Sequence, residues 1–227
     1  MNYKKEKIMK QIKTILIILV TFMSISCEDT FLSPDLTTGI NAENYFSNDT
    51  EIEAGVLNIY DGVQGVNALQ ITNNDLNHGV QVEFYVTEMR TDNTETKSNE
   101  GEAAQFEFFD IRSTNGIVAD YYRSYYNVVF RANLVLDNLS NASAAKAVAY
   151  EGEAKFLRAY AYFNLVRLFG DIPYVDKLIS PLDTQTAFTR VATTQIYDLI
   201  VADLQTAVAN LTDGGPNDRA SKAAAEG

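Results

Sequence analysis

One stretch of the chain limits the possible folds more than any other. In residues 151–169, EGEAKFLRAYAYFNLVRLF, four polar residues recur at helical intervals: Glu151, Lys155, Arg158 and Tyr162. Apolar residues cover much of the remaining circumference, so a helix here must pack against neighbours on more than one side. Gly170 and Pro173 predict its end, because glycine readily adopts the left-handed conformation that closes a helix and proline cannot continue one.

Three further segments, residues 47–65, 116–141 and 190–215, have the same period. Their expected buried faces are Ile52, Val56, Ile59 and Val63 in the first; Tyr122, Tyr126, Val129, Asn133, Leu136 and Leu139 in the second; and Ile196, Ile200, Leu204, Val208 and Leu211 in the third. The expected caps are Ser47, Asn48 or Asp49 for the first helix and Thr193 or Thr194 for the third. A buried amide needs partners, so Asn133 is expected to bond a neighbouring backbone. Residues 218–227 open a fifth helix.

Residues 66–117 differ from the rest because they have no sustained period. Polar, turn-rich stretches surround residues 80–89, VQVEFYVTEM, which are expected to form a short strand or a loosely structured pass. A long irregular insertion inside a compact domain is usually functional or disordered. The predicted fold class is therefore all-α, with helix pairs of tetratricopeptide-like length and a long irregular insertion. The pattern alone leaves a bundle and a solenoid both open.

The composition argues against nucleic-acid binding and against a metal site. The formal net charge is −12 at pH 7, and residues 1–26 carry five Lys and one Glu, so the remainder has a net charge of −16. Nucleic-acid-binding proteins instead cluster Lys and Arg on one face. Cys27 is the only cysteine and His78 the only histidine, which leaves no intrachain disulfide and no Cys–His or His-rich constellation. We expect no cofactor.

The first 26 residues have the three parts of a secretory signal. A basic start is followed by an apolar run from Thr14 to Ile25 and by small residues before a possible cleavage site. The run is too short to span a bilayer core of about 30 Å comfortably. A buried core helix is the alternative interpretation. Translation can begin at Met1 or at Met9.

Cys27 is expected to carry lipid. The stretch SISC resembles a bacterial lipobox, although Ser24 stands where Leu is usual. Several acyl chains, at about 0.8 kcal/mol per buried CH₂, would hold the protein to a membrane. Secretion with a free thiol is the alternative. The expected organisation is a lipoprotein signal peptide in residues 1–26, a lipidated N-terminus and acidic tether in 27–46, and a helical domain in 47–227.

Three stretches carry a resemblance to a known family. They are CEDTFLSPD from Cys27; NVVFRANLVLDNL followed by GEAKFLRAYAYFNLVRLFGDIPYV; and RVATTQIYDLIVADLQTAVANL with DRASKAAA. Together they resemble the SusD/RagB family of outer-membrane nutrient-binding lipoproteins of Bacteroidetes. Members of that family are much longer, so the chain resembles their N-terminal portion and looks truncated. The chain also has no Trp, which leaves the usual tryptophan positions of the family unfilled.

The resemblance implies a SusD-like α/α superhelical domain with tetratricopeptide-like units, exposed on the surface of the cell outer membrane. Such a protein acts as a hinged lid over a SusC-like TonB-dependent transporter and delivers oligosaccharides to it. Some members capture peptides instead. The implied partners are the transporter, an oligosaccharide ligand and the outer membrane through the lipid anchor, and the implied protein is not an enzyme.

Ligand contacts are expected in the irregular insertion. A sugar offers C–H faces to aromatic rings and hydroxyls to planar amide or carboxylate groups. The insertion supplies both, and the candidate ligand-binding residues are Asn74, Tyr85, Arg90, Asp92, Asn93 and Phe106. The alternative is that the aromatic residues pack the insertion onto the helices. Arg158 and Glu153 are expected to be structural ions, and Tyr122 and Tyr126 to lie in the core.

Two other functions stay open on the sequence alone. A scaffold that only docks the transporter would bind no glycan. A glycoside hydrolase would need two carboxylates about 5–10 Å apart, and the many Asp and Glu residues do not exclude such a pair. No pair placed for that chemistry is visible in the sequence, which favours binding over catalysis.

Overall fold

The computed structural model describes residue 13 and residues 45–65, 78–97, 101–179, 188–213 and 219–227. Contacts divide the chain into Met1–Tyr45 and Phe46–Gly227, and the second unit holds the helical domain. The apolar run, Cys27 and nearly all of the expected tether lie outside the described residues.

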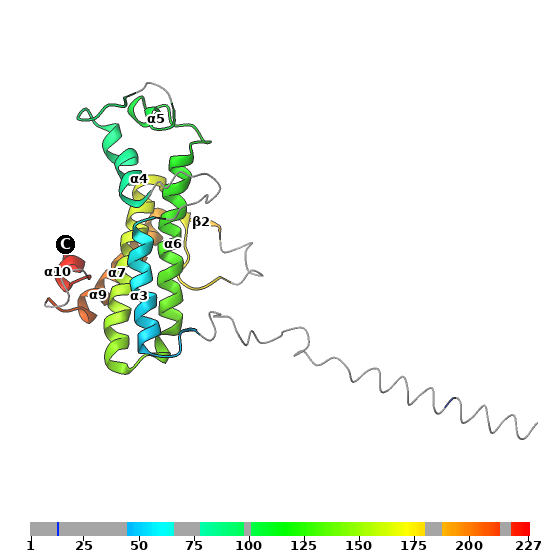
Figure 1. The fold of residues 1–227 in the computed structure, drawn as a ribbon, viewed down its shortest axis with the longest axis vertical. Coiled ribbons are helices and arrows are strands. Elements are labelled where there is room, and N and C mark those ends of the chain that lie inside the picture. Colours follow the sequence, from blue (N-terminus) through cyan, green and yellow to red (C-terminus); the bar gives the residue numbers. More distant parts are fainter. Residues whose placement is uncertain (1–12, 14–44, 66–77, 98–100, 180–187, 214–218) are drawn as a thin grey trace, which may run out of the picture. The chain divides into compact units, whose positions relative to one another are not determined.

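Four long helices build this unit: α3 (Asp49–Val63), α6 (Gly116–Asn138), α7 (Ala144–Phe169) and α9 (Thr193–Asn210). Figure 1 shows α3, α6 and α7 running side by side. Residue contacts pair α7 with α9, α6 and α3. The helix predicted from its wide apolar arc is thus α7, and its packing on more than one side is confirmed, as is the all-α fold class.

A glycine allows α7 and α9 to approach closely. A Cβ atom on Gly152 would lie 3.0 Å from the Cβ of Asn210 and 3.0 Å from the side chain of Leu211. Interiors are packed too densely to absorb such a contact without movement. Gly152 therefore keeps the end of α9 against the first half of α7.

Shorter elements join the long helices. They are α4 (His78–Thr87), η2 (Glu88–Arg90), α5 (Ala104–Glu107), η3 (Leu139–Asn141), β1 (Ile172–Pro173), β2 (Arg190–Val191) and α10 (Lys222–Glu226). Strands β1 and β2 pair antiparallel, with Ile172 opposite Val191. Helix α10, the expected fifth helix, packs on α9, where Ala225 joins Ala207 and Leu211 in a buried cluster.

The insertion is more helical than its sequence indicated. Residues 80–89 lie in α4 and η2, so the expectation of a short strand or loose pass was wrong. Their apolar residues alternate as in a strand, which conceals a second pattern. The buried residues are Val82, Val86 and Met89, spaced four and three apart as on one face of a helix.

A buried group of polar residues, which we call the polar junction, joins α6, α7 and α9. It consists of Arg158, Asp203, Asn133 and Tyr162. Arg158 donates from Nε to Oδ2 of Asp203 at 2.7 Å and from Nη2 to Oδ1 at 2.8 Å. Its Nη1 donates to Oδ1 of Asn133 at 2.7 Å and to the carbonyl of Asp176 at 3.0 Å. This arrangement confirms the structural role expected for Arg158.

The polar junction also fixes the chain after β1. The amide of Asn133 donates to the carbonyls of Val175 and Lys177, as expected for a buried amide. The hydroxyl of Tyr162 donates to the carbonyl of Val175 at 2.9 Å and accepts from its N–H at 2.7 Å. Burial raises the pKa of Tyr162 well above its usual value, so the phenol stays protonated.

The buried face of α6 agrees with the prediction at Val129 and Asn133 but not at its tyrosines. Its fully buried tyrosines are Tyr121 and Tyr125, whereas Tyr122 and Tyr126 are half-buried beside a mainly apolar cavity of about 400 Å³. The hydroxyl of Tyr126 donates to the carbonyl of Pro173 there. Apolar residues lie on both sides of this helix, so the period alone did not single out the core face.

The helix starts were predicted with mixed success. Asn48 caps α3 as expected, because its side chain accepts from the N–H groups of Thr50 and Glu51. Neither Thr193 nor Thr194 caps α9, whose N-cap is Ala192. A carboxylate from outside the helix takes that role: Oδ1 of Asp171 accepts from the N–H of Thr193 at 3.0 Å.

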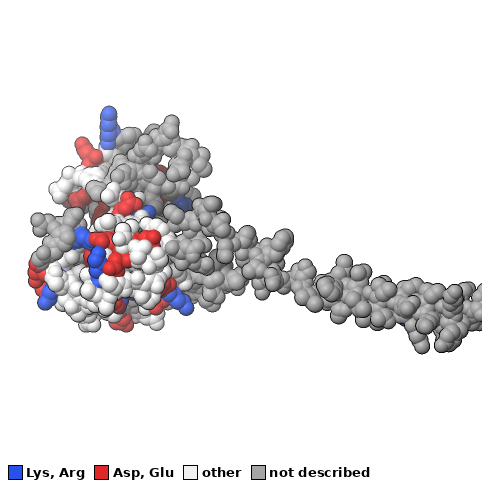
Figure 2. Space-filling model, turned by 60° about the horizontal axis from the view of Figure 1, so that its bottom comes forward, with Lys and Arg blue, Asp and Glu red and all other residues white. Residues whose placement is uncertain are grey.

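Ion pairs tie the C-terminal residues to the helices. Arg219 donates from Nε to Glu153 at 2.7 Å and from Nη1 to Glu53 at 3.0 Å. Glu153 also accepts from the hydroxyl of Tyr60 at 2.7 Å, so its expected structural role is confirmed. On the face drawn in Figure 2, basic side chains lie singly among acidic and uncharged ones and form no large patch. Among the described residues, no helix is long and apolar enough to span a bilayer.

Candidate functional site

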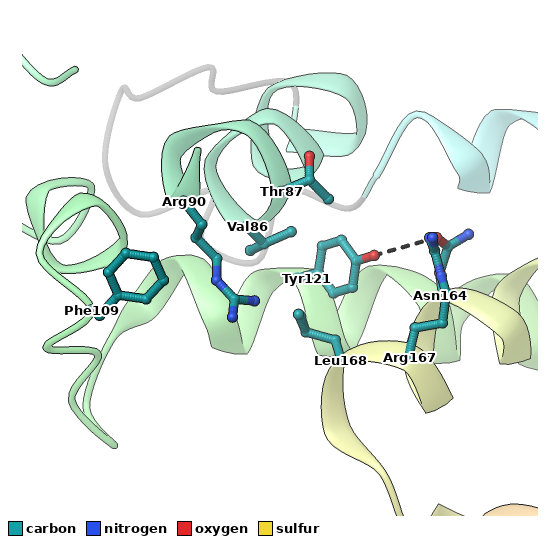
Figure 3. A pocket seen from close by; sticks show the side chains of 8 residues that line it. All are labelled: Val86, Thr87, Arg90, Phe109, Tyr121, Asn164, Arg167 and Leu168. Carbon is teal, nitrogen blue, oxygen red and sulfur yellow. Dashed lines mark hydrogen bonds between the residues drawn. The ribbon is translucent and has the colours of Figure 1, made fainter. Parts of the chain in front are cut away.

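A cavity of about 310 Å³ lies where the insertion meets the first half of α6 and the end of α7. Figure 3 shows the side chains that line it: Val86, Thr87, Arg90, Phe109, Tyr121, Asn164, Arg167 and Leu168. The first four belong to the insertion, on α4, η2 and the turn after α5, and the last four belong to α6 and α7. We call this cavity the Arg90 pocket. Two parts of the chain far apart in sequence thus contribute equally to its lining.

The long helices form a fixed side of the Arg90 pocket. The hydroxyl of Tyr121 lies 3.5 Å from Oδ1 of Asn164, the contact drawn in Figure 3. Nη2 of Arg167 donates to the same oxygen, and Nδ2 of Asn164 donates to the carbonyl of Tyr160 at 3.0 Å. The Arg167 guanidinium also lies over the ring of Phe163, 4.5 Å from its centroid. These contacts hold the amide and the guanidinium in one orientation.

Tyr121 is a neutral hydrogen-bonding group in this setting. Burial and the nearby Glu83 carboxylate raise the pKa of Tyr121 to about 12. Both causes disfavour the phenolate. The phenol therefore stays protonated through the physiological pH range and serves as a donor beside the amide of Asn164.

Arg90 is positioned by the turn that ends η2. The carbonyl of Glu88 accepts from the hydroxyl of Thr91 at 2.8 Å and from that of Thr94 at 2.6 Å, which fixes the backbone around Arg90. The Arg90 guanidinium lies 5.9 Å from the centroid of the Phe109 ring. The side chain of Arg90 is exposed, so its donors are open to a ligand.

Phe109 owes its position to the end of α5. Its φ of 54° is in the left-handed region, and the N–H of Asp110 donates to the carbonyl of Gln105 at 2.9 Å. This is the hydrogen bond of a Schellman-type helix end. Glycine is the usual residue at the position that Phe109 holds there. The ring is 67% exposed, so an aromatic face stands open at the edge of the pocket.

The lining has the chemistry of a polar-ligand site. Two exposed guanidiniums offer hydrogen-bond donors and Phe109 offers a ring face, while the buried Tyr121 and Asn164 bond each other. Such groups hold an oxygen-rich ligand by its hydroxyls and by its C–H surface. Within the described part of the chain, no group of three His, Cys, Asp or Glu residues could hold a metal ion.

The six predicted ligand residues fall in different places. Arg90 lines the pocket, and Asp92 and Asn93 are exposed in the turn directly after it, outside the lining. Tyr85 is half-buried on α4, with its ring in edge contact with Phe84. Phe106 is 1% exposed, so its side chain contributes to the core and not to a ligand-facing surface. Asn74 lies outside the described residues.

The sequence prediction missed the contribution of α7. Asn164 and Arg167 lie in the segment interpreted only as a packing helix, and Tyr121 lies next to the tyrosine assigned to the core. One signal was present: Asn164 and Arg167 are polar residues three apart that lie away from the polar stripe of the same helix. Residues with that spacing share a face, which here points to the insertion.

Comparisons with known proteins agree with this fold. The family model for SusD-like proteins, described as "Starch-binding associating with outer membrane", matches residues 44–227. The laminarin-binding SusD-like protein of known structure superposes with a TM-score of 0.65 and 26% sequence identity, over 79% of this chain and 38% of that one. The helical architecture is therefore the one found in SusD-like proteins.

Curated relatives give the same result over different lengths. SusD-like protein P25 of Formosa agariphila is 27% identical over 224 residues, which is 96% of this chain and 42% of the relative. SusD-like protein P2 of the same organism is 36% identical over 107 residues, which is 46% of this chain and 21% of the relative. The chain thus spans less than half the length of the curated relatives that it matches.

Proposed function

Because the chain belongs to the SusD-like family, we propose that it binds oligosaccharides in the Arg90 pocket and delivers them to a SusC-like TonB-dependent transporter of the outer membrane. The observation that carries the proposal is the convergence of Arg90, Phe109 and Arg167 on one cavity. These three side chains come from separate elements and supply two charged donors and a ring face, which suit the hydroxyls and the C–H surface of a sugar.

The comparisons support glycans as the ligand class. The family description names starch binding, and the structural relative at 26% identity is a laminarin-binding protein. Both ligands are polymers of hydroxyl-rich sugar rings. Peptide capture is the second candidate, and a peptide would use the same amide and guanidinium groups.

We further propose that the protein binds its ligand without cleaving it. Glycoside hydrolysis generally requires two carboxylates about 5–10 Å apart on either side of the scissile bond. The described lining of the Arg90 pocket contains guanidinium, amide, phenol and hydroxyl groups, with no Asp or Glu among them.

The proposed anchor is a lipid on Cys27, which would place the helical domain at the surface of the outer membrane. The support is the sequence alone, because this residue follows a signal-like segment and the acidic stretch after it is a suitable tether. Cys27→Ala is expected to move the protein from the membrane fraction to the soluble fraction of its host. Recovery of the variant in membranes at the wild-type level would contradict the lipid anchor.

Calorimetry of the purified 227-residue chain against a panel of oligosaccharides tests the binding function. We expect binding to at least one glycan, weakened by roughly 3- to 10-fold in Phe109→Ala through loss of the ring contact. Phe130→Ala is the matched control, because Phe130 is an exposed phenylalanine on α6 outside this pocket. A scaffold that only docks the transporter would bind no glycan, and a peptide-binding protein would respond only to a peptide panel.

A further inference from the structure

Two of the side chains that line the Arg90 pocket are guanidiniums, and none is a carboxylate. Figure 3 shows Arg90 and Arg167 on the two sides of the Tyr121 ring. Among the residues that the structure describes, no Asp or Glu forms an ion pair with either guanidinium. The pocket therefore contains two positive charges that the described protein leaves unpaired.

This is unusual within the molecule. Of the six other arginines that the structure describes, Arg190 has no carboxylate partner and five do: Arg112, Arg123, Arg131, Arg158 and Arg219. The chain has 30 Asp and Glu against 18 Lys and Arg, so acidic partners are plentiful. Two arginines without a carboxylate partner in one cavity are therefore unexpected in a protein with an excess of acidic residues.

The acidic residues nearest in sequence neither line the pocket nor pair with its guanidiniums, although the Glu83 carboxylate lies near Tyr121. Glu83 accepts a hydrogen bond from the hydroxyl of Tyr125 at 3.1 Å, and Asp110 pairs with Arg112 at 3.7 Å. Glu107 accepts from the N–H and hydroxyl of Thr96. The side chains of Glu88 and Asp92 are exposed to water and do not line the cavity.

From this charge distribution we infer that the pocket selects anionic glycans, in which the sugar carries a uronate carboxylate or a sulfate ester. The inference rests on the proposed glycan-binding function. A guanidinium presents parallel N–H donors that match two oxygens of such a group and forms stronger hydrogen bonds with it than with a hydroxyl. Phe109 remains available for the ring face of the same sugar or of its neighbour.

Because the protein as a whole is negatively charged, it should attract an anionic glycan only at the Arg90 pocket. An anionic polymer is repelled by most of the surface and attracted where the two guanidiniums are exposed together. Raising the salt concentration from about 0.1 M to about 1 M shortens the screening length from about 10 Å to about 3 Å. Binding of an anionic glycan should weaken over that range, and binding of a neutral glycan should change little.

Three classes of probe test the inference by calorimetry on the 227-residue chain: oligogalacturonate, which carries carboxylates only; carrageenan oligosaccharide, which carries sulfate esters; and the neutral laminarin and maltose oligosaccharides. We expect one anionic class to bind at least about ten-fold more tightly than the neutral glycans. The anionic class that binds identifies the charged group. Equal or tighter binding of a neutral glycan would overturn the inference and leave the proposed function standing, whereas no binding in any arm would overturn both.

Arg90→Gln separates charge from ordinary hydrogen bonding, because glutamine retains donors without a charge. We expect it to weaken binding of the anionic glycan by about ten-fold or more and to weaken binding of a neutral glycan by clearly less, because glutamine still donates to a hydroxyl. Arg123→Gln is the matched control, since Arg123 is an exposed arginine on α6 that pairs with Asp120 and lies outside the pocket. An equal loss for charged and neutral glycans in Arg90→Gln would show a plain donor role and would contradict the inference.

Discussion

Arg158 in the polar junction and Arg90 in the pocket are the same kind of side chain in opposite circumstances. Arg158 is 6% exposed and makes four hydrogen bonds, two of them to the carboxylate of Asp203. Arg90 is exposed, lies against the ring of Phe109 and has no carboxylate partner among the described residues. A guanidinium whose donors are used within the protein holds helices together, and one whose donors are left over is available to a ligand.

The two arginines differ in how far their charge depends on neighbouring groups. Removing a charge from water costs several kcal/mol, and only a well-aligned partner offsets that cost. Arg158 cannot lose Asp203 without leaving a charge buried. Arg90 keeps its hydration whatever its neighbours do. Substitutions should therefore act on stability at the first site and on binding at the second.

The largest expected effect is that of Asp203→Ala. It leaves the buried Arg158 charge without its carboxylate, which is expected to lower the free energy of unfolding by about 3–5 kcal/mol. Denaturant unfolding followed by circular dichroism measures this change. The control is Asp198→Ala, because Asp198 is an exposed aspartate on the same helix. A loss below about 1 kcal/mol would show that Arg158 finds another partner or reaches water.

A double substitution sharpens the same prediction. In Arg158→Met with Asp203→Leu, both charges are replaced by apolar side chains, which is often neutral for a buried pair. We expect it to recover most of the stability lost in Asp203→Ala. The recovery would be incomplete, because Asn133 would lose the donor that satisfies its Oδ1.

The smallest expected effect on stability is that of Arg90→Gln. Surface substitutions without buried contacts usually change the free energy of unfolding by less than about 0.5 kcal/mol. The same denaturant experiment, run beside the binding measurements on this variant, checks the contrast. A loss as large as that of Asp203→Ala would break the comparison, because Arg90 would then be a structural residue.

The long helices could be predicted because each has a clear period and a clear end. Residues 151–169 required neighbours on several sides, and α7 has them. Asn133 on an apolar face required partners, and it bonds the carbonyls of Val175 and Lys177. Arguments of this kind succeed because a buried polar group must find hydrogen-bond partners and a wide apolar surface must be covered by neighbouring elements.

The pocket could be predicted only in part, because its residues come together through tertiary packing. Arg90 was predicted from the polarity of its loop. Asn164 and Arg167 were not, because they lie in a helix whose pattern indicated only core packing. Phe106 and Phe109 lie three residues apart and look alike in the sequence, but Phe106 is 1% exposed and Phe109 is 67% exposed. That difference depends on where α5 ends, which no local pattern fixed.

The shared lining of the pocket has an evolutionary consequence. The long helices, whose geometry is set by the core, carry Tyr121, Asn164 and Arg167. The insertion, which has its own turns, carries Arg90 and Phe109. Substitutions in the insertion could adapt the pocket to a new ligand and leave the helical framework unchanged. Under the proposed function, diversification would require changes in a few loop codons, and the helical half of the pocket lining would be inherited unaltered.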